Sequence, residues 1–163
     1  MRRSRLRTGL LLVILLAGAA WWLLPAANSA PDVQFTTISG KKISLQALRG
    51  KPVLVTFWAT DCPSCIQEIP HLISLYRQFH ERGLEIIAVA MYYDPPNHVV
   101  EMARTRRLPY DIALDLRGSH ARAFGNVQLT PSTFLISPQG SIVAQITGAF
   151  DFRQMQDNID NML

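Results

Sequence analysis

The chain contains very few cysteines: its 163 residues include only two, Cys62 and Cys65. A framework of several disulfides is excluded, because neither cysteine has any possible partner except the other. A zinc site is disfavoured, since four scattered histidines without ligand spacing would have to complete it. Covalent haem attachment needs a histidine directly after the second cysteine, and Ile66 stands there instead. Any disulfide in this chain must therefore join these two thiols to each other.

The sequence has little charge imbalance once its first residues are set aside. The formal net charge of +4 comes entirely from arginines at positions 2, 3, 5 and 7, and the rest of the chain carries 12 basic and 12 acidic side chains. No basic face is evident, so no nucleic-acid partner is expected. The remainder also lacks internal repeats and low-complexity tracts.

Only one hydrophobic run is long. From Gly9 to Leu24 no residue is charged, and with residues 25–27 the run reaches the roughly 17–20 residues that a bilayer span requires. The basic flank predicts one N-terminal transmembrane helix whose start stays in the cytoplasm. The alternative is a secretory signal removed near residues 27–30, with Ala27 and Ser29 as its small residues.

These features divide the chain into two parts. Residues 1–30 are interpreted as basic flank, anchor or signal, and linker, and residues 31–163 as one domain. Either reading of the first part places the domain across a membrane, in a compartment that permits disulfides. We expect a bacterial inner-membrane protein with its domain in the periplasm, or a soluble periplasmic domain if the signal is cleaved.

Strand and helix patterns alternate along the domain, which favours an α/β fold with a mixed sheet. Residues 51–59 and 84–93 are apolar without alternation, as in strands buried on both faces. Ser44 is a candidate cap for a short helical turn and Asp151 for the last helix. Helices are predicted over 63–83, from 96 to 109, over 119–125 and over 151–163, a strand over 110–116, and hairpins around turns at 39–40 and 137–140.

The cysteine motif lies where a buried strand meets a helix. A right-handed βαβ unit over residues 52–91 puts Cys62 at the carboxyl end of the strand and the amino end of the helix. Unpaired N–H groups and partial positive charge there favour a thiolate. Cys-x-x-Cys thiols in such positions have pKa values of about 3.5–7.5 instead of 8.5. One helical turn brings Cys65 back to Cys62. A purely structural disulfide is a weaker reading, since so small a ring constrains the unfolded chain little.

These residues carry a family resemblance. The stretches FWATDCPSC, EIP and LTPSTFLISPQGSIV resemble the thioredoxin superfamily, and more narrowly the membrane-anchored TlpA/ResA/CcmG-type thiol–disulfide oxidoreductases. The match covers about residues 33–163. It includes residues 94–115, which resemble the helix–strand insertion of those proteins. The resemblance implies a thioredoxin fold with this TlpA-like insertion.

The resemblance also implies roles for individual residues. Cys62 corresponds to the nucleophile and Cys65 to the resolving thiol, so their redox-active disulfide is the only cofactor expected. Pro131 corresponds to a cis-proline packed against the disulfide, and the Thr130 backbone to a docking edge for an extended substrate. Glu68 corresponds to an acidic residue that acts as a proton relay or substrate contact. A solvated helix position is the alternative for Glu68.

Other motif positions support the pair or depart from the family pattern. Pro63 suits the first helical turn, and Pro63 and Ser64 form the inner dipeptide. Trp58 is interpreted mainly as a core residue beside the motif. Asp61 stands where the family commonly has tryptophan, and its carboxylate is expected to oppose thiolate formation at Cys62. Thr56 replaces the buried aspartate of thioredoxin and cannot act as a base.

The sequence therefore predicts an enzyme that exchanges disulfides with other proteins. The family resemblance favours reduction of specific envelope proteins, with a role in cytochrome c maturation or metal-centre assembly, and a membrane thiol carrier as electron donor. An oxidase or isomerase of secreted proteins is the second hypothesis. A Cu(I)-binding chaperone that uses both thiols as soft ligands is the third.

Overall fold

The computed structural model describes residues 28–163. The predicted anchor or signal falls on residues 1–27 and lies outside the described part of the chain. Within residues 28–163, no helix is both long and apolar enough to cross a bilayer.

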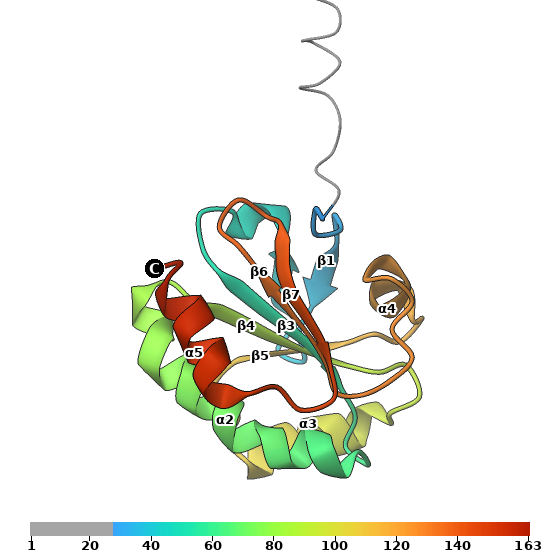
Figure 1. Cartoon of the computed structure of the whole chain (residues 1–163). Coiled ribbons are helices and arrows are strands. Elements are labelled where there is room, and N and C mark those ends of the chain that lie inside the picture. Colours follow the sequence, from blue (N-terminus) through green and yellow to red (C-terminus); the bar gives the residue numbers. More distant parts are fainter. Residues whose placement is uncertain (1–27) are drawn as a thin grey trace, which may run out of the picture.

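A five-stranded mixed sheet in the order β5-β4-β3-β6-β7 forms the centre of the fold (Figure 1). β3 runs parallel to β4, and β4 runs parallel to β5. β6 pairs antiparallel with β3 and with β7. The mixed sheet confirms the α/β prediction. The bounds are β3 Val53–Trp58, β4 Glu85–Ala90, β5 Asp111–Leu114, β6 Ser132–Ile136 and β7 Ile142–Thr147.

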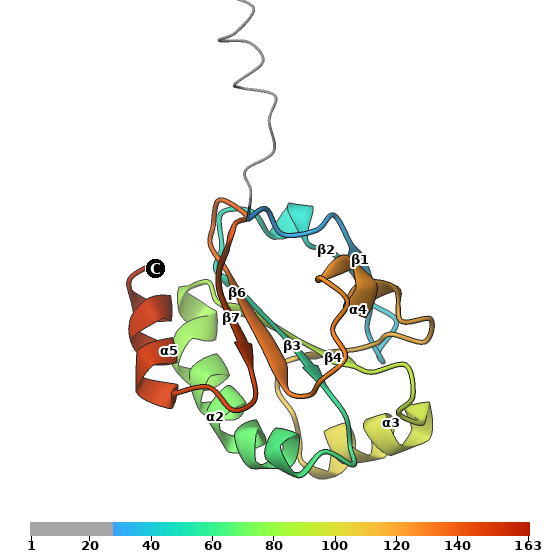
Figure 2. The same ribbon diagram turned by 45° about the vertical axis from the view of Figure 1, so that its right-hand side comes forward.

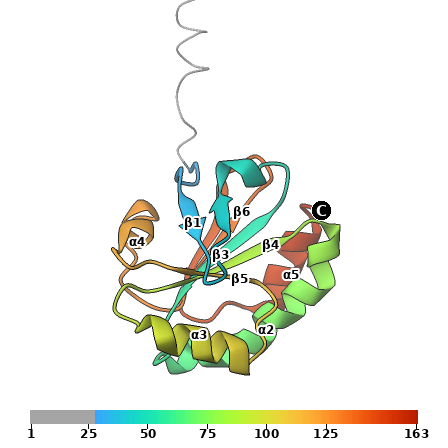
Figure 3. The same ribbon diagram turned by 180° about the vertical axis from the view of Figure 1, so that it is seen from behind.

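Helices cover one face of this sheet, and a small hairpin with a short helix covers the other (Figures 2 and 3). The first layer contains α2 (Pro63–Phe79), α3 (Pro96–Thr105) and α5 (Phe152–Asp160). The opposite layer contains α4 (Ser119–Ala123) and the β1–β2 hairpin. The remaining bounds are β1 Gln34–Thr36, β2 Lys42–Ser44, η1 Gln46–Leu48 and η2 His80–Arg82.

Strand β3 supports the site because the whole strand is buried. Its residues alternate between the two cores: Leu54 and Trp58 pack on the α2 side, and Val55 and Phe57 on the hairpin side. This arrangement confirms the prediction of a strand buried on both faces. A rigid central strand fixes the position at which the cysteine motif begins.

Several element ends differ from the sequence prediction. β4 ends at Ala90, and Tyr92 and Tyr93 lie exposed in the turn that follows, because Asp94 begins a tight connection to α3. α3 ends at Thr105, before Pro109 is reached. Ser44 belongs to β2 and does not cap η1, which begins without a side-chain cap. The predicted cap at α5 is confirmed, since Asp151 Oδ1 accepts a 2.8 Å bond from the Gln154 N–H.

The chain enters the domain at the turn between β6 and β7. The Ala30 N–H donates to the Gly140 carbonyl at 2.9 Å, and the Ile142 N–H donates to the Asn28 carbonyl at 2.7 Å. Residues 28–30, expected to be linker, are thus paired with the edge of the sheet. This entry lies at the end of β6 remote from Pro131, and the amino end of α2 lies at the opposite end of the molecule (Figure 1).

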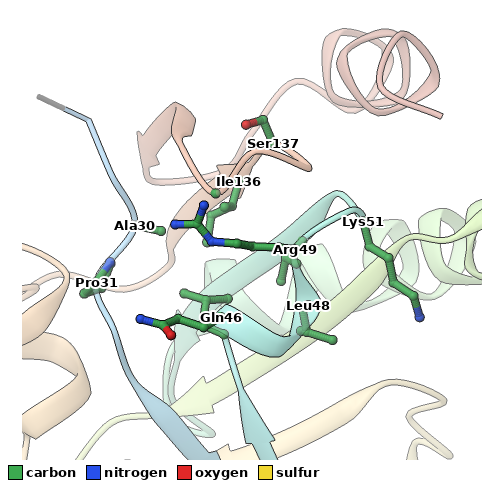
Figure 4. A pocket seen from close by; sticks show the side chains of 11 residues that line it. Ala30, Pro31, Gln46, Leu48, Arg49, Lys51, Ile136 and Ser137 are labelled. Carbon is green, nitrogen blue, oxygen red and sulfur yellow. The ribbon is translucent and has the colours of Figure 1, made fainter. Parts of the chain in front are cut away.

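The Arg49 side chain also holds the β6–β7 turn in place. Its Nη1 donates to the Gln139 carbonyl at 3.2 Å, and its side chain lies near Ala30 in a small hollow (Figure 4). Gly140 has a φ of 84°, and a Cβ there would come within 3.2 Å of the guanidinium carbon. The positive φ favours glycine at this turn, and a Cβ there would in addition make the Arg49 side chain shift by a few tenths of an ångström.

Candidate active site

The two cysteines form a disulfide at the amino end of α2. Cys62 is the N-cap residue and is partly exposed, whereas Cys65 is only 3% exposed. The Cys65 N–H donates to the Cys62 sulfur at 3.2 Å. This helix N–H therefore points at the outer sulfur, where it would stabilise negative charge once the disulfide opens. The arrangement separates an accessible sulfur from a buried one.

The Thr130–Pro131 peptide bond is cis, as predicted, and it lies against the disulfide. The Thr130 carbonyl oxygen is 3.5 Å from the Cys62 sulfur, and Pro131 is buried. Within residues 28–163 the Thr130 N–H donates to no other group. A backbone donor thus remains available beside the reactive sulfur, which is the condition for pairing with an extended segment.

The motif residues around Cys62 face solvent. Pro63 occupies the first position of α2 and is exposed, and Asp61 is exposed as well. The Ser64 hydroxyl lies 3.4 Å from the Cys62 sulfur. Hydroxyl and sulfur are therefore close enough for the hydroxyl to donate to a thiolate.

Glu68 is buried on α2, with 3% of its surface exposed, so the alternative of a solvated helix position is wrong. Its Oε1 accepts a 3.1 Å hydrogen bond from the Phe150 N–H. Burial raises the pKa of the Glu68 carboxyl to about 7, and the Phe150 bond opposes this only in part. One helical turn separates it from Cys65, so the two side chains lie on the same inner face.

Tyr110 is a second buried titratable residue that the Glu68 charge affects. It is 6% exposed, and burial together with the Glu68 charge raises the pKa of its hydroxyl well above the usual value. Tyr110 therefore stays protonated. Glu68, whose pKa is about 7, can by contrast exchange its proton near neutral pH.

Trp58 and Thr56 extend from β3 under the helix. Trp58 is 5% exposed and packs in the same core cluster as Cys65, which confirms its assignment to the core. Its Nε1–H has no hydrogen-bond partner among residues 28–163. The Thr56 hydroxyl bonds to the Thr133 hydroxyl across the β3–β6 pair at 2.9 Å. Thr56 is thus a satisfied structural group.

Asp94 is a site residue that the sequence analysis missed. It follows β4 and is 5% exposed, and its two oxygens accept 2.7 Å bonds from the N–H and the hydroxyl of Thr60. Thr60 lies two residues before Cys62, in the connection from β3 to α2. One signal was present in the sequence: an aspartate directly after a buried parallel strand, at the edge of the sheet where the cysteine motif begins.

Comparisons with known proteins place this geometry in a family. Residues 26–145 match the model of the AhpC/TSA family. The thiol–disulfide oxidoreductase ResA of Bacillus subtilis is 30% identical, covering 96% of this chain and 91% of its own. ResA of Bacillus cereus is 29% identical over 96% of both chains. A putative thioredoxin from Neisseria meningitidis superposes with a TM-score of 0.77 at 29% identity, covering 84% of this chain and 91% of its own.

The Neisseria structure shares the fold of this chain, in which a central mixed sheet carries a Cys-x-x-Cys pair at a helix start beside a cis-proline. A further solved structure, a thiol:disulfide interchange protein from Chlorobium tepidum, shares the fold with a TM-score of 0.76. The chain therefore belongs to the AhpC/TSA family of thioredoxin-like proteins and is a thiol–disulfide oxidoreductase of the ResA type with Cys62 and Cys65 as its cysteine pair.

Proposed function

We propose that this enzyme works as a reductant of disulfides in proteins of the cell envelope. One observation carries the assignment of roles: Cys62 is partly exposed at the N-cap of α2, while Cys65 is buried behind it. Only Cys62 is placed to attack a disulfide in another protein. Cys65 is placed to attack the sulfur of Cys62 from inside.

The thiol–disulfide exchange proceeds in two steps. The Cys62 thiolate attacks one sulfur of the substrate disulfide, forming a mixed disulfide and releasing the other substrate sulfur as a thiolate that takes a proton. Cys65 then loses its proton and attacks Cys62. The second substrate thiol leaves, and the Cys62–Cys65 disulfide remains. Two electrons and two protons pass to the substrate, and a thiol donor must restore the dithiol.

Glu68 supplies the proton acceptor for the second step. A carboxyl with a pKa of about 7 is present in both forms near neutral pH, and the ionised form accepts the Cys65 proton. Its burial on the inner face of α2 puts it on the Cys65 side of the disulfide. The same group returns the proton when the disulfide is reduced again.

The Thr130 backbone provides the docking edge. Its unpaired N–H and its carbonyl, 3.5 Å from the Cys62 sulfur, suit an extended substrate strand laid across the cis-proline loop. Recognition through backbone groups favours unfolded or flexible disulfide segments. Specific partners such as immature cytochromes or metal-site proteins belong to this class.

The direction of electron flow is expected to be reductive. Asp61 is an exposed carboxylate beside Cys62 and disfavours its thiolate, so the reduced form gains less stability than in an oxidant. We expect a midpoint potential close to the value of about −270 mV of thioredoxin, measured by equilibration with glutathione or dithiothreitol at pH 7. An insulin-reduction assay should show turnover. A potential near −120 mV, the range of strong oxidants, would contradict reduction and support the oxidase alternative.

The basic flank and apolar run before residue 28 support attachment to the bacterial inner membrane, with the domain in the periplasm and a membrane thiol carrier as electron donor. Full-length protein is expected to stay with membranes after alkaline carbonate washing. A soluble product whose mass begins near residue 30 would show that the segment is a cleaved signal. The catalytic proposal is independent of that outcome.

A further inference from the structure

We propose that Asp94 is a positioning residue, which holds the loop before Cys62 in place and whose negative charge lowers the thiolate fraction of reduced Cys62. Asp94 is not part of the cysteine motif and lies on a different strand connection, after β4. Asp94 would thus set the reactivity of the Cys62 sulfur, whichever direction electrons flow.

Two hydrogen bonds join Asp94 to the loop before Cys62. Asp94 accepts two hydrogen bonds from Thr60, each of 2.7 Å. The Thr60 N–H donates to one carboxylate oxygen and the Thr60 hydroxyl to the other. Both oxygens act as acceptors, which is the pattern of an ionised carboxylate. Bonds of this length to a charged acceptor are among the stronger hydrogen bonds in proteins. Thr60 is thus held by both its backbone and its side chain.

The connection around Asp94 is itself stiff. The Asp94 N–H donates to the Met91 carbonyl at 3.0 Å, and the Met91 N–H donates to the Trp58 carbonyl at 3.0 Å. Pro95 and Pro96 follow directly, and Pro96 begins α3. Proline fixes its own backbone angle and restricts the preceding residue. The carboxylate is therefore supported from both sides, and it fixes the segment that leads into Cys62.

Asp94 also brings a buried negative charge to the region of Cys62. Asp94 is 5% exposed, and among residues 28–163 no lysine, arginine or histidine forms an ion pair with it. Two Cα–Cα steps of about 3.8 Å separate Thr60 from Cys62. With the 2.7 Å hydrogen bond and the bonds that lead to the sulfur added, the charge lies within roughly 15 Å of the sulfur. At an effective dielectric constant near 20, reduced by screening, this repulsion suppresses the thiolate roughly three- to tenfold.

This charge opposes the amino end of α2, which favours the thiolate through the Cys65 N–H. Asp61, exposed beside Cys62, acts in the same direction as Asp94. Asp94 differs because its burial leaves it poorly screened by solvent and salt. Cys62 is then a less acidic thiol than its helix position alone would make it, so less of it is present as thiolate at neutral pH.

The test compares charge removal with bond removal in the full-length chain. Asp94→Asn keeps an acceptor for the Thr60 N–H but is neutral, whereas Thr60→Val loses the hydroxyl bond and leaves the charge. Both are made in a Cys65→Ser background so that a single thiol reacts, and alkylation by iodoacetamide is followed from pH 5 to pH 9.5. Asp157→Asn, at an exposed position on α5, is the matched control.

We expect the Asp94→Asn protein to be alkylated roughly three to ten times faster than its parent at pH 6, and within twofold of it at pH 9.5, where both are thiolates. Thr60→Val is expected to keep the parental pH profile but to unfold at lower denaturant concentration. Asp157→Asn should match the parent in both measurements. Asp94→Ser, smaller but also neutral, serves if Asp94→Asn does not fold.

Two results would overturn the proposal. If the alkylation rates of the neutral Asp94 variants and of the parent depend on pH in the same way, the Asp94 charge has no effect on Cys62. A profile displaced equally by Thr60→Val would show that loop position, and not charge, controls Cys62. Because alkylation needs no partner protein, these outcomes are independent of the insulin assay and of the measured potential.

Discussion

Cys65→Ser protein is expected to stop at the mixed disulfide with its substrate. Cys62 still attacks, but the buried position 65 no longer offers a thiol to displace the product. Intramolecular groups act at effective concentrations of about 10⁵ M or more in favourable geometries, so a millimolar external thiol should restore less than about a thousandth of the turnover. Insulin reduction, with non-reducing electrophoresis of the stopped reaction, measures both the loss and the adduct.

The matched variant is Cys62→Ser, in which the one remaining thiol is the buried Cys65. It is expected to form no adduct, because the remaining sulfur at position 65 is 3% exposed. Adduct formation on Cys65 in that variant would reverse the two assigned roles. Full-length Cys65→Ser protein expressed in its host would also retain the natural substrate for identification by mass spectrometry.

Glu68→Gln is the substitution with the next largest expected effect, and its effect depends on pH. In the parent, the second step should accelerate as pH rises through about 7, since the ionised carboxyl is the proton acceptor. Glutamine cannot accept the proton, so turnover should fall on the order of 10²-fold at pH 8 and lose this rise. Insulin-reduction rates from pH 5.5 to 8.5 test the difference.

The same substitution is expected to stabilise the folded chain at alkaline pH. The pKa of Glu68 rises on folding from 4.5 to about 7, so the folded state binds this proton more tightly than the unfolded state. The cost of ionising the buried group is absent below pH 4.5 and grows until pH 7. Relative to the parent, Glu68→Gln should therefore gain roughly 2–3 kcal/mol of unfolding free energy between pH 5 and pH 8.

Denaturant unfolding of the oxidised protein at the two pH values measures this gain. Glu81→Gln is the control, because it removes an exposed glutamate next to the end of α2. It should change stability equally at both pH values. A constant difference between Glu68→Gln and the parent would show that Glu68 is already ionised at pH 5, and the proton-transfer role would fail with it.

The centre of the fold and the redox pair could be predicted from the sequence because their signals are local. Six consecutive buried residues in β3 contain β-branched and aromatic side chains, and the helix that follows repeats its apolar residues at helical spacing. Cys62 sits between them, so its place at the helix start follows from adjacent segments alone. The cis bond at Pro131 came from the motif resemblance and not from its local sequence.

The environment of Glu68 could not be predicted, because residues distant in the chain create it. Phe150, 82 positions later, donates the hydrogen bond, and Tyr110, just before β5, is close enough for the Glu68 charge to raise its pKa. From the sequence of the helix alone, a solvent-exposed position for Glu68 is as plausible as a buried one. The contact between Asp94 and Thr60 spans 34 residues and depends on the pairing of β3 with β4.

Tyr92 and Tyr93 show how local propensity misleads. Aromatic residues favour strands, so the apolar run 84–93 was predicted to be one strand. The connection through Asp94 and two prolines ends β4 at Ala90 and leaves both rings exposed. Competition between a strand pattern and the turn that follows is resolved only by tertiary contacts.

The described chain begins at the β6–β7 turn, at the end of β6 remote from Pro131. β6 separates that turn from Pro131, and its five residues span roughly 17 Å. If the segment before residue 28 holds the protein to a bilayer, the point of attachment and the sulfur pair lie at opposite ends of the domain. Secreted targets could then reach the sulfur pair directly from solution. A donor embedded in the lipid would reach the sulfur pair only through a protruding loop or after the whole domain tilts.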